Sequence, residues 1–285
     1  MAKSFSKVAE ISPNRLLIVD ALNLAFRYKH AKSTQFVDDY IRVVESLAKS
    51  YKTGKVIITC DQGSSSYRKE IFPEYKDNRK EKFANQTEEE AKEFEDFFQE
   101  FTCTLLQIAE GTDFPVLQFN KVEADDIAAY IVGKRHLYDI EHTWLISSDR
   151  DWDLLVMEDV SRFSYVTRKE TRIDNWSEHY DCTPEEYISI KCLTGDAGDN
   201  IKGVPSVGPV RAAALVKEYG SAFDIADAIP IASRYKYIQE LNKCKDLILL
   251  NYQLMDLVTY SADAVGKENC AKIDEVLKEY LPCKS

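Results

Sequence analysis

The sequence predicts an α/β protein with a mostly parallel central sheet flanked by helices. Four short β-branched or aliphatic runs are typical of buried strands: residues 16–19, 56–60, 114–119 and 144–147. Segments with helical periodicity separate them, among them residues 37–49 and 125–133. Strands that alternate with helices favour βαβ units and therefore a parallel sheet. The 16 Tyr, 13 Phe and 3 Trp exclude a chain that is disordered throughout.

No apolar run approaches the ~18 residues of a membrane-spanning helix. The N-terminus also lacks the apolar stretch of a signal peptide. The seven cysteines form no C-x-x-C pair, so neither a disulfide framework nor a zinc site is expected. We therefore expect a cytoplasmic protein with no membrane partner, and a monomer, because no coiled-coil pattern is present.

Acidic residues gather where the predicted strands end. Asp20 and Asp61 follow the first two strands. Three further motifs, EADD, SDRDWD and GDAGDN, supply Glu123, Asp125, Asp126, Asp149, Asp151, Asp196 and Asp199. Because the carboxyl ends of parallel strands share one edge of a sheet, the strand-end carboxylates are expected to open onto one rim. Glu123 and Asp126 are also spaced to share one helical face.

These carboxylates predict a metal centre. A single Asp at a strand end is usually a turn or capping residue, but nine carboxylates in four clusters would repel one another without cations. Oxygen-only ligands suit a hard ion such as Mg²⁺ or Mn²⁺. Two such ions can clamp a phosphodiester and generate hydroxide for in-line attack. Asp153 is left out of this set, because it can face away as a helix cap. The formal net charge of −11 does not exclude nucleic acid as a partner, because these nine carboxylates would account for most of it.

The stretch from residue 67 to 82, YRKEIFPEYKDNRKEK, is strongly basic and carries Tyr67 and Tyr75. It predicts a loop or arch that stands away from the sheet. Thr87 and Glu90 then form a capping box, and an apolar stripe of Phe residues follows at helical spacing. The arch is expected to span about residues 67–110.

Helical patterns dominate from about residue 175, so two units are expected: a core over residues 1–175 and a helical region over residues 176–285. Thr183 begins a helix that runs to about Leu193. The turn-rich segment GDAGDNIKGVPSVGPV follows, and a second helix runs over residues 211–219 and ends at Gly220.

Five motifs, VDALN, PEYKDNR, VEADD, SSDRDWD and GDAGDNIKGVPSVG, occur in this order. Together they resemble the 5′ nuclease or flap endonuclease superfamily, in particular the stand-alone 5′ exonucleases of tailed bacteriophages of the T-odd group. The resemblance spans about residues 15–260. It implies a PIN-like nuclease core, a helical arch and a helix–hairpin–helix (helix–three-turn–helix) motif. It also implies a two-metal flap endonuclease and 5′-3′ exonuclease acting on DNA with 5′ flaps or free 5′ ends, in phage DNA replication in the host cytoplasm.

The resemblance assigns roles to individual residues. One metal group would include Asp20, Asp61, Glu123 and Asp125. The second would include Asp126, Asp149, Asp151, Asp196 and Asp199. Lys76 and Arg79 match the arch residues that meet the scissile phosphate, where their charge offsets charge that develops in the transition state. Tyr75 would stack on a base. Arg27 would steer the 5′ strand, and Lys191 is a further candidate of the same kind.

The segment VPSVGPVRAA matches the helix–hairpin–helix that binds duplex phosphates through backbone N–H groups. The residues concerned are Gly203, Val204, Ser206, Gly208 and Arg211. The resemblance also implies a K⁺ ion in this turn. Three departures stand out. Ser206 replaces a commoner Gly, Val210 stands where Lys is common, which predicts weaker duplex binding, and Asp77 stands where close relatives have Gly.

Three alternatives remain open. A junction-binding protein without catalysis would retain DNA affinity and cleave nothing. A phosphatase with an aspartyl nucleophile expects D-x-D after the first strand, whereas this chain has Asp20-Ala21-Leu22-Asn23. A single-strand ribonuclease of similar core fold would lack both the basic arch and the hairpin.

Overall fold

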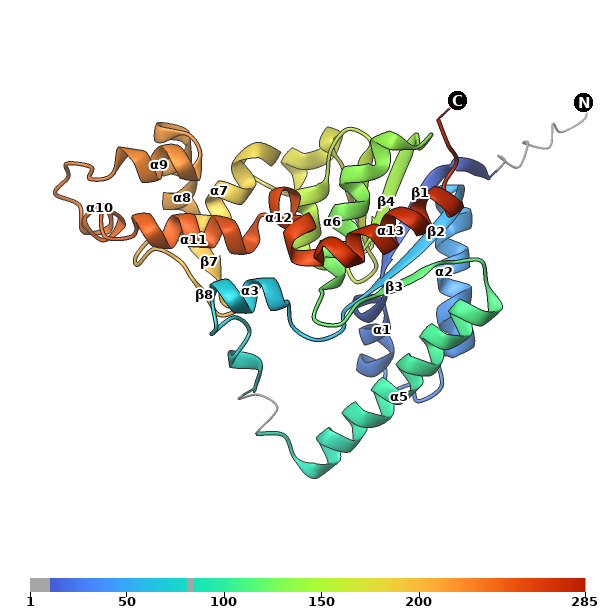
Figure 1. Cartoon of the computed structure of the whole chain (residues 1–285). Helices are drawn as coiled ribbons and strands as arrows, with labels where there is room; N and C mark the ends of the chain where they lie inside the picture. The colour runs from blue at the N-terminus through green and yellow to red at the C-terminus, as the bar shows by residue number, and fades with distance from the viewer. Residues whose placement is uncertain (1–10, 81–84, 285) are drawn as a thin grey trace, which may run out of the picture.

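The computed structural model describes residues 11–80 and 85–284. At its centre lies a six-stranded sheet in the order β3-β2-β1-β4-β5-β6 (Figure 1). The first five strands are parallel, and β6 pairs antiparallel with β5. The strand bounds are β1 Ser12–Asp20, β2 Thr53–Cys60, β3 Val116–Gln118, β4 His142–Ile146, β5 Val160–Ser164 and β6 Lys169–Thr171. The predicted α/β fold with a mostly parallel sheet is confirmed.

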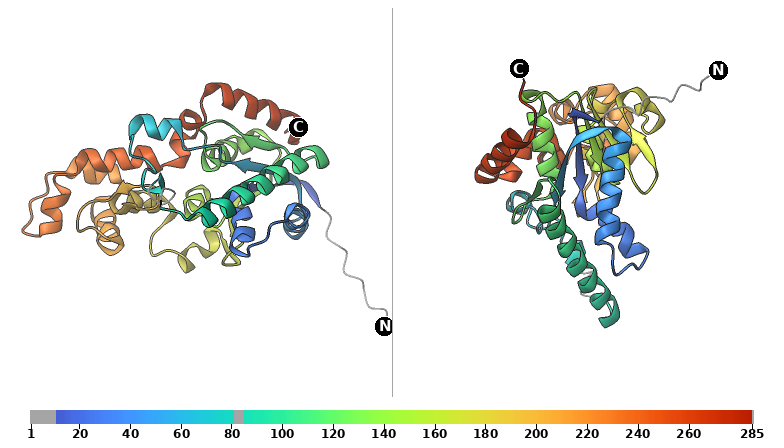
Figure 2. Two further views of the ribbon diagram at one scale, coloured as in Figure 1. Left: turned by 90° about the horizontal axis from the view of Figure 1, so that it is seen from below. Right: turned by 90° about the vertical axis from the view of Figure 1, so that its right-hand side faces the viewer.

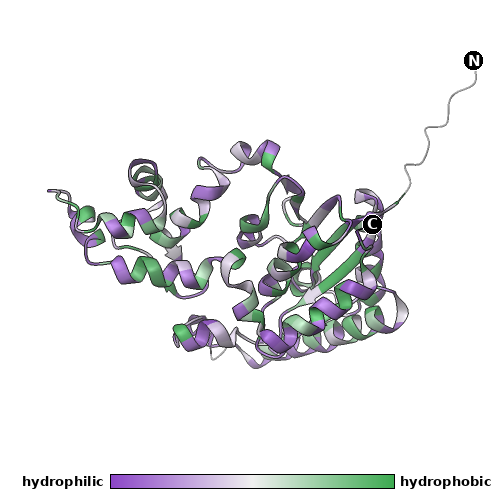
Figure 3. Cartoon of the chain, turned by 45° about the horizontal axis from the view of Figure 1, so that its top comes forward, coloured by the Kyte–Doolittle hydropathy of each residue, from purple (hydrophilic) through white to green (hydrophobic). Residues whose placement is uncertain are grey.

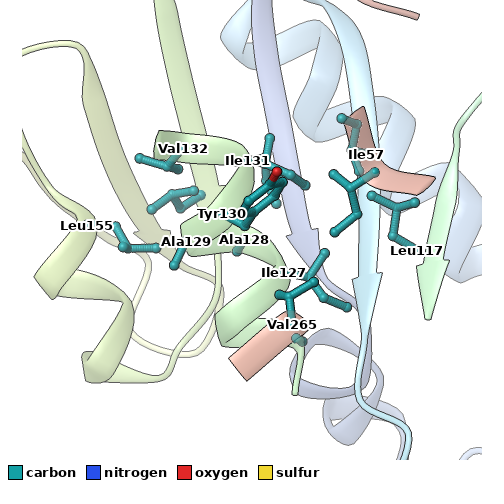
Figure 4. Close-up of a cluster of buried hydrophobic side chains, with 14 of the residues drawn as sticks. Ile57, Leu117, Ile127, Ala128, Ala129, Tyr130, Ile131, Val132, Leu155 and Val265 are labelled. Atoms are coloured by element: carbon teal, nitrogen blue, oxygen red, sulfur yellow. The ribbon is translucent and has the colours of Figure 1, made fainter. Parts of the chain in front are cut away.

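Helices cover both faces of this sheet, as the right-hand view of Figure 2 shows. One face packs against α1 Ala21–His30, α2 Val37–Tyr51 and α5 Glu88–Gly111. The other packs against α6 Ala124–Lys134, α12 Leu257–Val265 and α13 Lys267–Tyr280. The close-up in Figure 4 shows α6 side chains, among them Ile127 and Ile131, facing Ile57 of β2.

The central strand explains why the sequence shows continuous apolar runs. Leu16 and Ile18 enter the cluster under α6, whereas Leu17 and Val19 enter the cluster under α2 and α5. All four are fully buried, because a strand covered on both faces has no solvent side to carry polar residues. Ribbon at the centre of the sheet accordingly appears green, the hydrophobic end of the scale, in Figure 3.

The last two strands of the sheet were not predicted from the sequence. β5 has the sequence Val-Ser-Arg-Phe-Ser, in which Arg162 and two serines are buried. Arg162 donates to both carboxylate oxygens of Asp153, at 2.5 and 2.7 Å. A buried ion pair inside a strand breaks the apolar run by which sequence analysis recognises strands. β3 is also shorter than the predicted run at residues 114–119.

The basic stretch is only partly an arch. Its first residues form helix α3, Ser66–Ile71, which Ser65 caps by accepting from the backbone N–H of Arg68. Residues 81 and 82 of the stretch lie outside the described residues. The predicted capping box at Thr87 and Glu90 begins α5. This helix projects away from the sheet, below α1 in Figure 1.

A helical region follows the sheet and surrounds a third hydrophobic cluster. It comprises α7 Pro184–Thr194, the two-stranded hairpin of β7 Gly195–Asp196 and β8 Ile201–Lys202, α8 Pro209–Tyr219, α9 Ala222–Ala228, α10 Lys236–Leu241 and α11 Lys245–Met255. The chain then returns to the sheet, where the Tyr280 hydroxyl accepts from the backbone N–H of Val56 at 3.1 Å. In the described part of the chain no helix is long and apolar enough to span a membrane.

The hairpin packs against the end of α7 without room for a side chain. A Cβ on Gly203 would lie 2.2 Å from the carbonyl oxygen of Thr194. Gly195, at φ 70°, would bring a Cβ within 2.3 Å of the backbone nitrogen of Gly203. This contact fixes the loop that carries Asp196 and Asp199.

We expect Gly203→Ala to lower the free energy of unfolding by about 2 kcal/mol or more, because the new methyl group meets backbone atoms that must shift. Gly133→Ala is the matched control: it lies in α6, where nothing stands within 4 Å of the place its methyl group would take, and it should raise stability by about 0.5–1 kcal/mol. Urea unfolding of both variants tests this. Equal effects would contradict the close approach.

Candidate active site

A cavity of about 490 Å³ opens at the carboxyl ends of the first strands. Six acidic and four basic side chains line it: Asp20, Asp61, Asp77, Glu123, Asp125, Asp149, Lys69, Lys76, Arg79 and Lys80. Asp20 ends β1, Asp61 follows β2, Glu123 is the N-cap of α6, and Asp149 begins the short 3₁₀ helix Arg150–Leu155. The structure therefore brings the predicted strand-end acids onto one rim.

Asp20 is buried at the junction of β1 and α1. One of its oxygens accepts from the backbone N–H of Asn23 at 3.2 Å, and the other accepts from the Ser147 hydroxyl at 2.7 Å. Burial, together with the negative charge of Asp61, raises the pKa of Asp20 to about 8. Burial also raises the pKa of Asp61, against the effect of a 2.6 Å hydrogen bond from the backbone N–H of Ala124.

Asp125 also carries an electrostatic penalty. Burial, followed by the charges of Asp149, Asp61 and Asp20, raises its pKa well above the usual range. Its Oδ1 accepts from the indole N–H of Trp152 at 2.6 Å. This bond fixes the carboxylate but brings no positive charge to it.

A second acidic group lies beside the first, where the helical region meets the core. Asp151 accepts from Lys191 Nζ at 2.6 Å, and Asp196 lies 3.7 Å from the same atom. Burial raises the pKa of Asp151 to about 6, although Lys191 opposes the shift. Asp199 accepts from Arg79 at 2.7 Å. Lys191 is thus engaged inside the site in this structure, where its side chain is only 13% exposed, and its role in steering a strand stays a prediction.

Lys76 enters the site from the base of the arch. Its Nζ donates to Glu123 at 2.8 Å and lies 3.7 Å from Asp199. Although burial opposes ionisation of Glu123, the positive charges of Lys76 and Arg68 hold its pKa below the usual range. Lys76 itself has φ 57°, a left-handed conformation.

Tyr75 corrects one prediction. The resemblance implies that it stacks on a base, but it is 2% exposed and belongs to the hydrophobic cluster of the helical region. Its hydroxyl donates to Glu123 at 2.9 Å and to Asp199 at 3.0 Å. Tyr75 therefore joins the two acidic groups, and its ring is not available to a nucleotide.

The position of Asp126 also differs from the predicted one. It does share a helical face with Glu123, but that face meets Arg68 and not the cavity. Arg68 donates to both oxygens of Asp126, at 2.6 and 2.8 Å, and to the carbonyl of Leu254 at 2.8 Å. Both side chains are buried, both oxygens of Asp126 bind Arg68, and Asp126 does not line the cavity. Sequence analysis missed Arg68, because nothing local distinguishes it from the other basic residues of the stretch.

The predicted DNA contacts lie apart from the cavity. The Arg27 guanidinium lies over the ring of Tyr165, at 4.4 Å from the ring centroid. In the hairpin turn, Val204 is buried and Gly208 caps α8. Ser206 has φ 64°, which explains why glycine suits this position. Arg211 donates to the carbonyl of Ser206 at 2.5 Å. The roles of these residues stay predictions.

The donor chemistry of the site fits hard divalent ions. The donors are carboxylates, and the raised pKa values of Asp20 and Asp125 arise from burial and mutual repulsion, which a cation would relieve. Within residues 11–80 and 85–284, however, no three His, Cys, Asp or Glu side chains converge in a geometry that could hold an ion. Glu123, Asp151 and Asp199 instead bind Lys76, Lys191 and Arg79.

Two family models cover most of the chain. Residues 15–181 match the N-terminal resolvase-like domain of 5′-3′ exonucleases, and residues 182–274 match the C-terminal SAM fold of the same enzymes. The chain therefore belongs to the 5′-3′ exonuclease family. The resemblance to 5′ nucleases is confirmed, whereas the predicted division after residue 175 stays a prediction.

Individual relatives place the chain more narrowly. It is 42% identical to the flap endonuclease of Escherichia phage T5 over 99% of this chain and 98% of that protein. A crystal structure of a T5 flap endonuclease variant in complex with DNA and metal ions has a TM-score of 0.88 and covers 93% of this chain and 98% of that one. The flap endonuclease Xni of Aeromonas hydrophila is 27% identical over 85% of this chain and 90% of that protein.

Two neighbouring aspartates should respond oppositely to the same substitution. We expect Asp126→Asn to lower the free energy of unfolding by about 3 kcal/mol, because buried Arg68 loses its bidentate carboxylate partner and keeps only the longer 3.6 Å contact with Glu123. Asp125→Asn should raise it, because a carboxyl whose folded pKa lies above its unfolded pKa destabilises the fold at alkaline pH. Urea unfolding at pH 8 in EDTA measures both. A loss of stability in Asp125→Asn would contradict this account.

Proposed function

We propose that this protein is a Mg²⁺-dependent, structure-specific 5′ nuclease that acts as a flap endonuclease and 5′-3′ exonuclease on DNA. The single observation that carries the proposal is the cavity in which strand-end carboxylates face Lys76 and Arg79 from the arch. The 42% identity to the T5 flap endonuclease over nearly the whole chain supports it. A place in phage DNA replication in the host cytoplasm is part of the same proposal.

Two groups of side chains would hold the ions. Asp20, Asp61, Glu123 and Asp125 would serve one ion, and Asp149, Asp151, Asp196 and Asp199 would serve the other, some of them through water. Mg²⁺ or Mn²⁺ bound there would supply a hydroxide nucleophile and charge to offset the phosphate oxygens. Asp126 is left out, because both its oxygens bind Arg68.

The basic residues of the site would change partners during the reaction. Glu123 and Asp199 hold Lys76 and Arg79 in this structure. If these carboxylates held metal ions instead, Lys76 and Arg79 would be free to meet a phosphate group in the cavity. Their fixed charge then stabilises the transition state. Lys191 would be released from Asp151 in the same way.

The hairpin turn between β8 and α8 would bind duplex DNA. Backbone N–H groups at the N-terminus of α8 can contact phosphates without selecting a sequence. A K⁺ ion in this turn belongs to the proposal. Val210, which is 86% exposed at the start of α8, offers no charge to the duplex.

The catalytic proposal is tested with a 5′-labelled flap duplex in Mg²⁺ and in EDTA. Cleavage near the junction should require Mg²⁺, and Asp149→Asn should slow it by about 100-fold or more. Asp227→Asn is the matched control, because this aspartate is 84% exposed on α9 and pairs only with Lys245 among the described residues. Binding without cleavage in both Mg²⁺ and Mn²⁺ would instead identify a non-catalytic junction-binding protein.

The duplex-binding proposal predicts a gain of function. Val210→Lys should tighten duplex binding and steepen the dependence of log affinity on log salt by about 0.9, the contribution of one additional phosphate contact. Val258→Lys, at an exposed position of α12, is the control and should leave the slope unchanged. Fluorescence anisotropy between about 50 and 200 mM salt measures both. An unchanged slope for Val210→Lys would place the duplex elsewhere.

A further inference from the structure

Two asparagines tie the base of the arch to the acidic loop of the helical region. Asn78 Nδ2 donates to the carbonyl of Ala197 at 2.8 Å and approaches that of Gly198 at 3.4 Å. Asn200 Nδ2 donates in the opposite direction, to the carbonyl of Glu74 at 2.8 Å. Each side chain thus bonds to the backbone of the other segment, and we call this reciprocal pair the asparagine clasp.

Lys76 and Asp199 lie between the two halves of the clasp. The backbone N–H of Lys76 donates to the backbone carbonyl of Asp199 at 3.0 Å. The clasp therefore brackets a direct backbone contact between the arch and the acidic loop. The Asn78 and Asn200 side chains do not line the 490 Å³ cavity, so they can act on a substrate only through the residues they hold.

The clasp coincides with an unfavourable backbone conformation. Lys76 has φ 57° and Asn200 has φ 62°. A left-handed conformation costs an ordinary L-residue roughly 1–2 kcal/mol, although asparagine tolerates it well. Such strain persists only where the surroundings over-determine the backbone. For Lys76 the surroundings that do so are the clasp and the backbone bond to Asp199.

We propose that Asn78 and Asn200 are positioning residues for phosphodiester cleavage. The clasp holds Lys76 in its left-handed conformation and so aims Nζ into the acidic cavity, where it meets Glu123 at 2.8 Å. Without the clasp the base of the arch is held to the loop only through Asp199, by Tyr75, Lys76 and Arg79, and Lys76 relaxes away from the reacting phosphate. This inference rests on the proposed nuclease function and assigns side chains that the proposed mechanism does not use.

Two substitutions remove the clasp with little change of shape. Asn78→Asp is isosteric, but it places a carboxylate oxygen against the carbonyl of Ala197 in place of the donor. Asn200→Gly keeps the left-handed backbone accessible and removes only the side-chain bond. Asn14→Ala is the matched control, since Asn14 Nδ2 makes one hydrogen bond of 2.6 Å to Asp139, at the other end of β1 from the cavity.

The measurements separate positioning from binding and from folding. Single-turnover cleavage of the flap duplex in Mg²⁺ should slow by about tenfold in Asn78→Asp and in Asn200→Gly, the effect of losing about one hydrogen bond's worth of preorganisation. The Kd in EDTA and the unfolding midpoint should stay near those of the wild-type protein. Asn14→Ala should cleave at the wild-type rate.

Removal of Lys76 supplies the decisive comparison. If the clasp acts through Lys76, Asn78→Asp should cause no further loss of rate in a Lys76→Ala background. An equal loss in both backgrounds, or a wild-type rate in both single variants, would overturn the clasp. If Asn78→Asp unfolds, the same comparison with Asn200→Gly decides. A wild-type protein that cleaves no flap would overturn the nuclease function itself, so the two failures are distinguishable.

Discussion

Repulsion among carboxylates at one end of a parallel sheet is the constraint on which the site depends. Strand ends in such a sheet converge by geometry, and here the segments that follow β1, β2, β3 and β4 each bring an acid to one cavity. Four basic side chains form ion pairs with these carboxylates: Arg68, Lys76, Arg79 and Lys191. None of them comes from a strand of the central sheet. The core supplies most of the negative charge, the hairpin loop of the helical region adds Asp196 and Asp199, and the segments packed around the core supply the positive charge.

The sheet and its acidic rim could be predicted from the sequence because both depend on residues that are close together in the chain. A strand buried on both faces appears as an unbroken apolar run, and the acid at its end has a fixed place relative to that run. Leu16 to Asp20 and Val56 to Asp61 have this form. The capping boxes at Thr87 and Thr183 are equally local, and both begin helices in the structure.

The sequence does not show which side chains that lie far apart in the chain contact one another. Arg68 and Asp126 are 58 positions apart, and each looks like an ordinary member of its own charged cluster. Tyr75 lies in a basic stretch that suggests exposure, yet its ring is buried against residues more than 100 positions later in the chain. Local pattern reports which side chains are charged or aromatic. Only the fold decides which of them meet, and pairing is what removes Asp126 and Tyr75 from direct contact with a substrate.

The return of α13 to the sheet has a consequence for biosynthesis. This helix completes the hydrophobic cluster on the α6 side, and its Tyr280 bonds to the backbone of β2. A ribosome releases the strands first and this covering helix long after them. The nascent nuclease core therefore has an incomplete sheet face while the whole helical region is still being made. Its final packing awaits α13, so a chain terminated before that helix leaves an exposed apolar surface, and not a shorter enzyme.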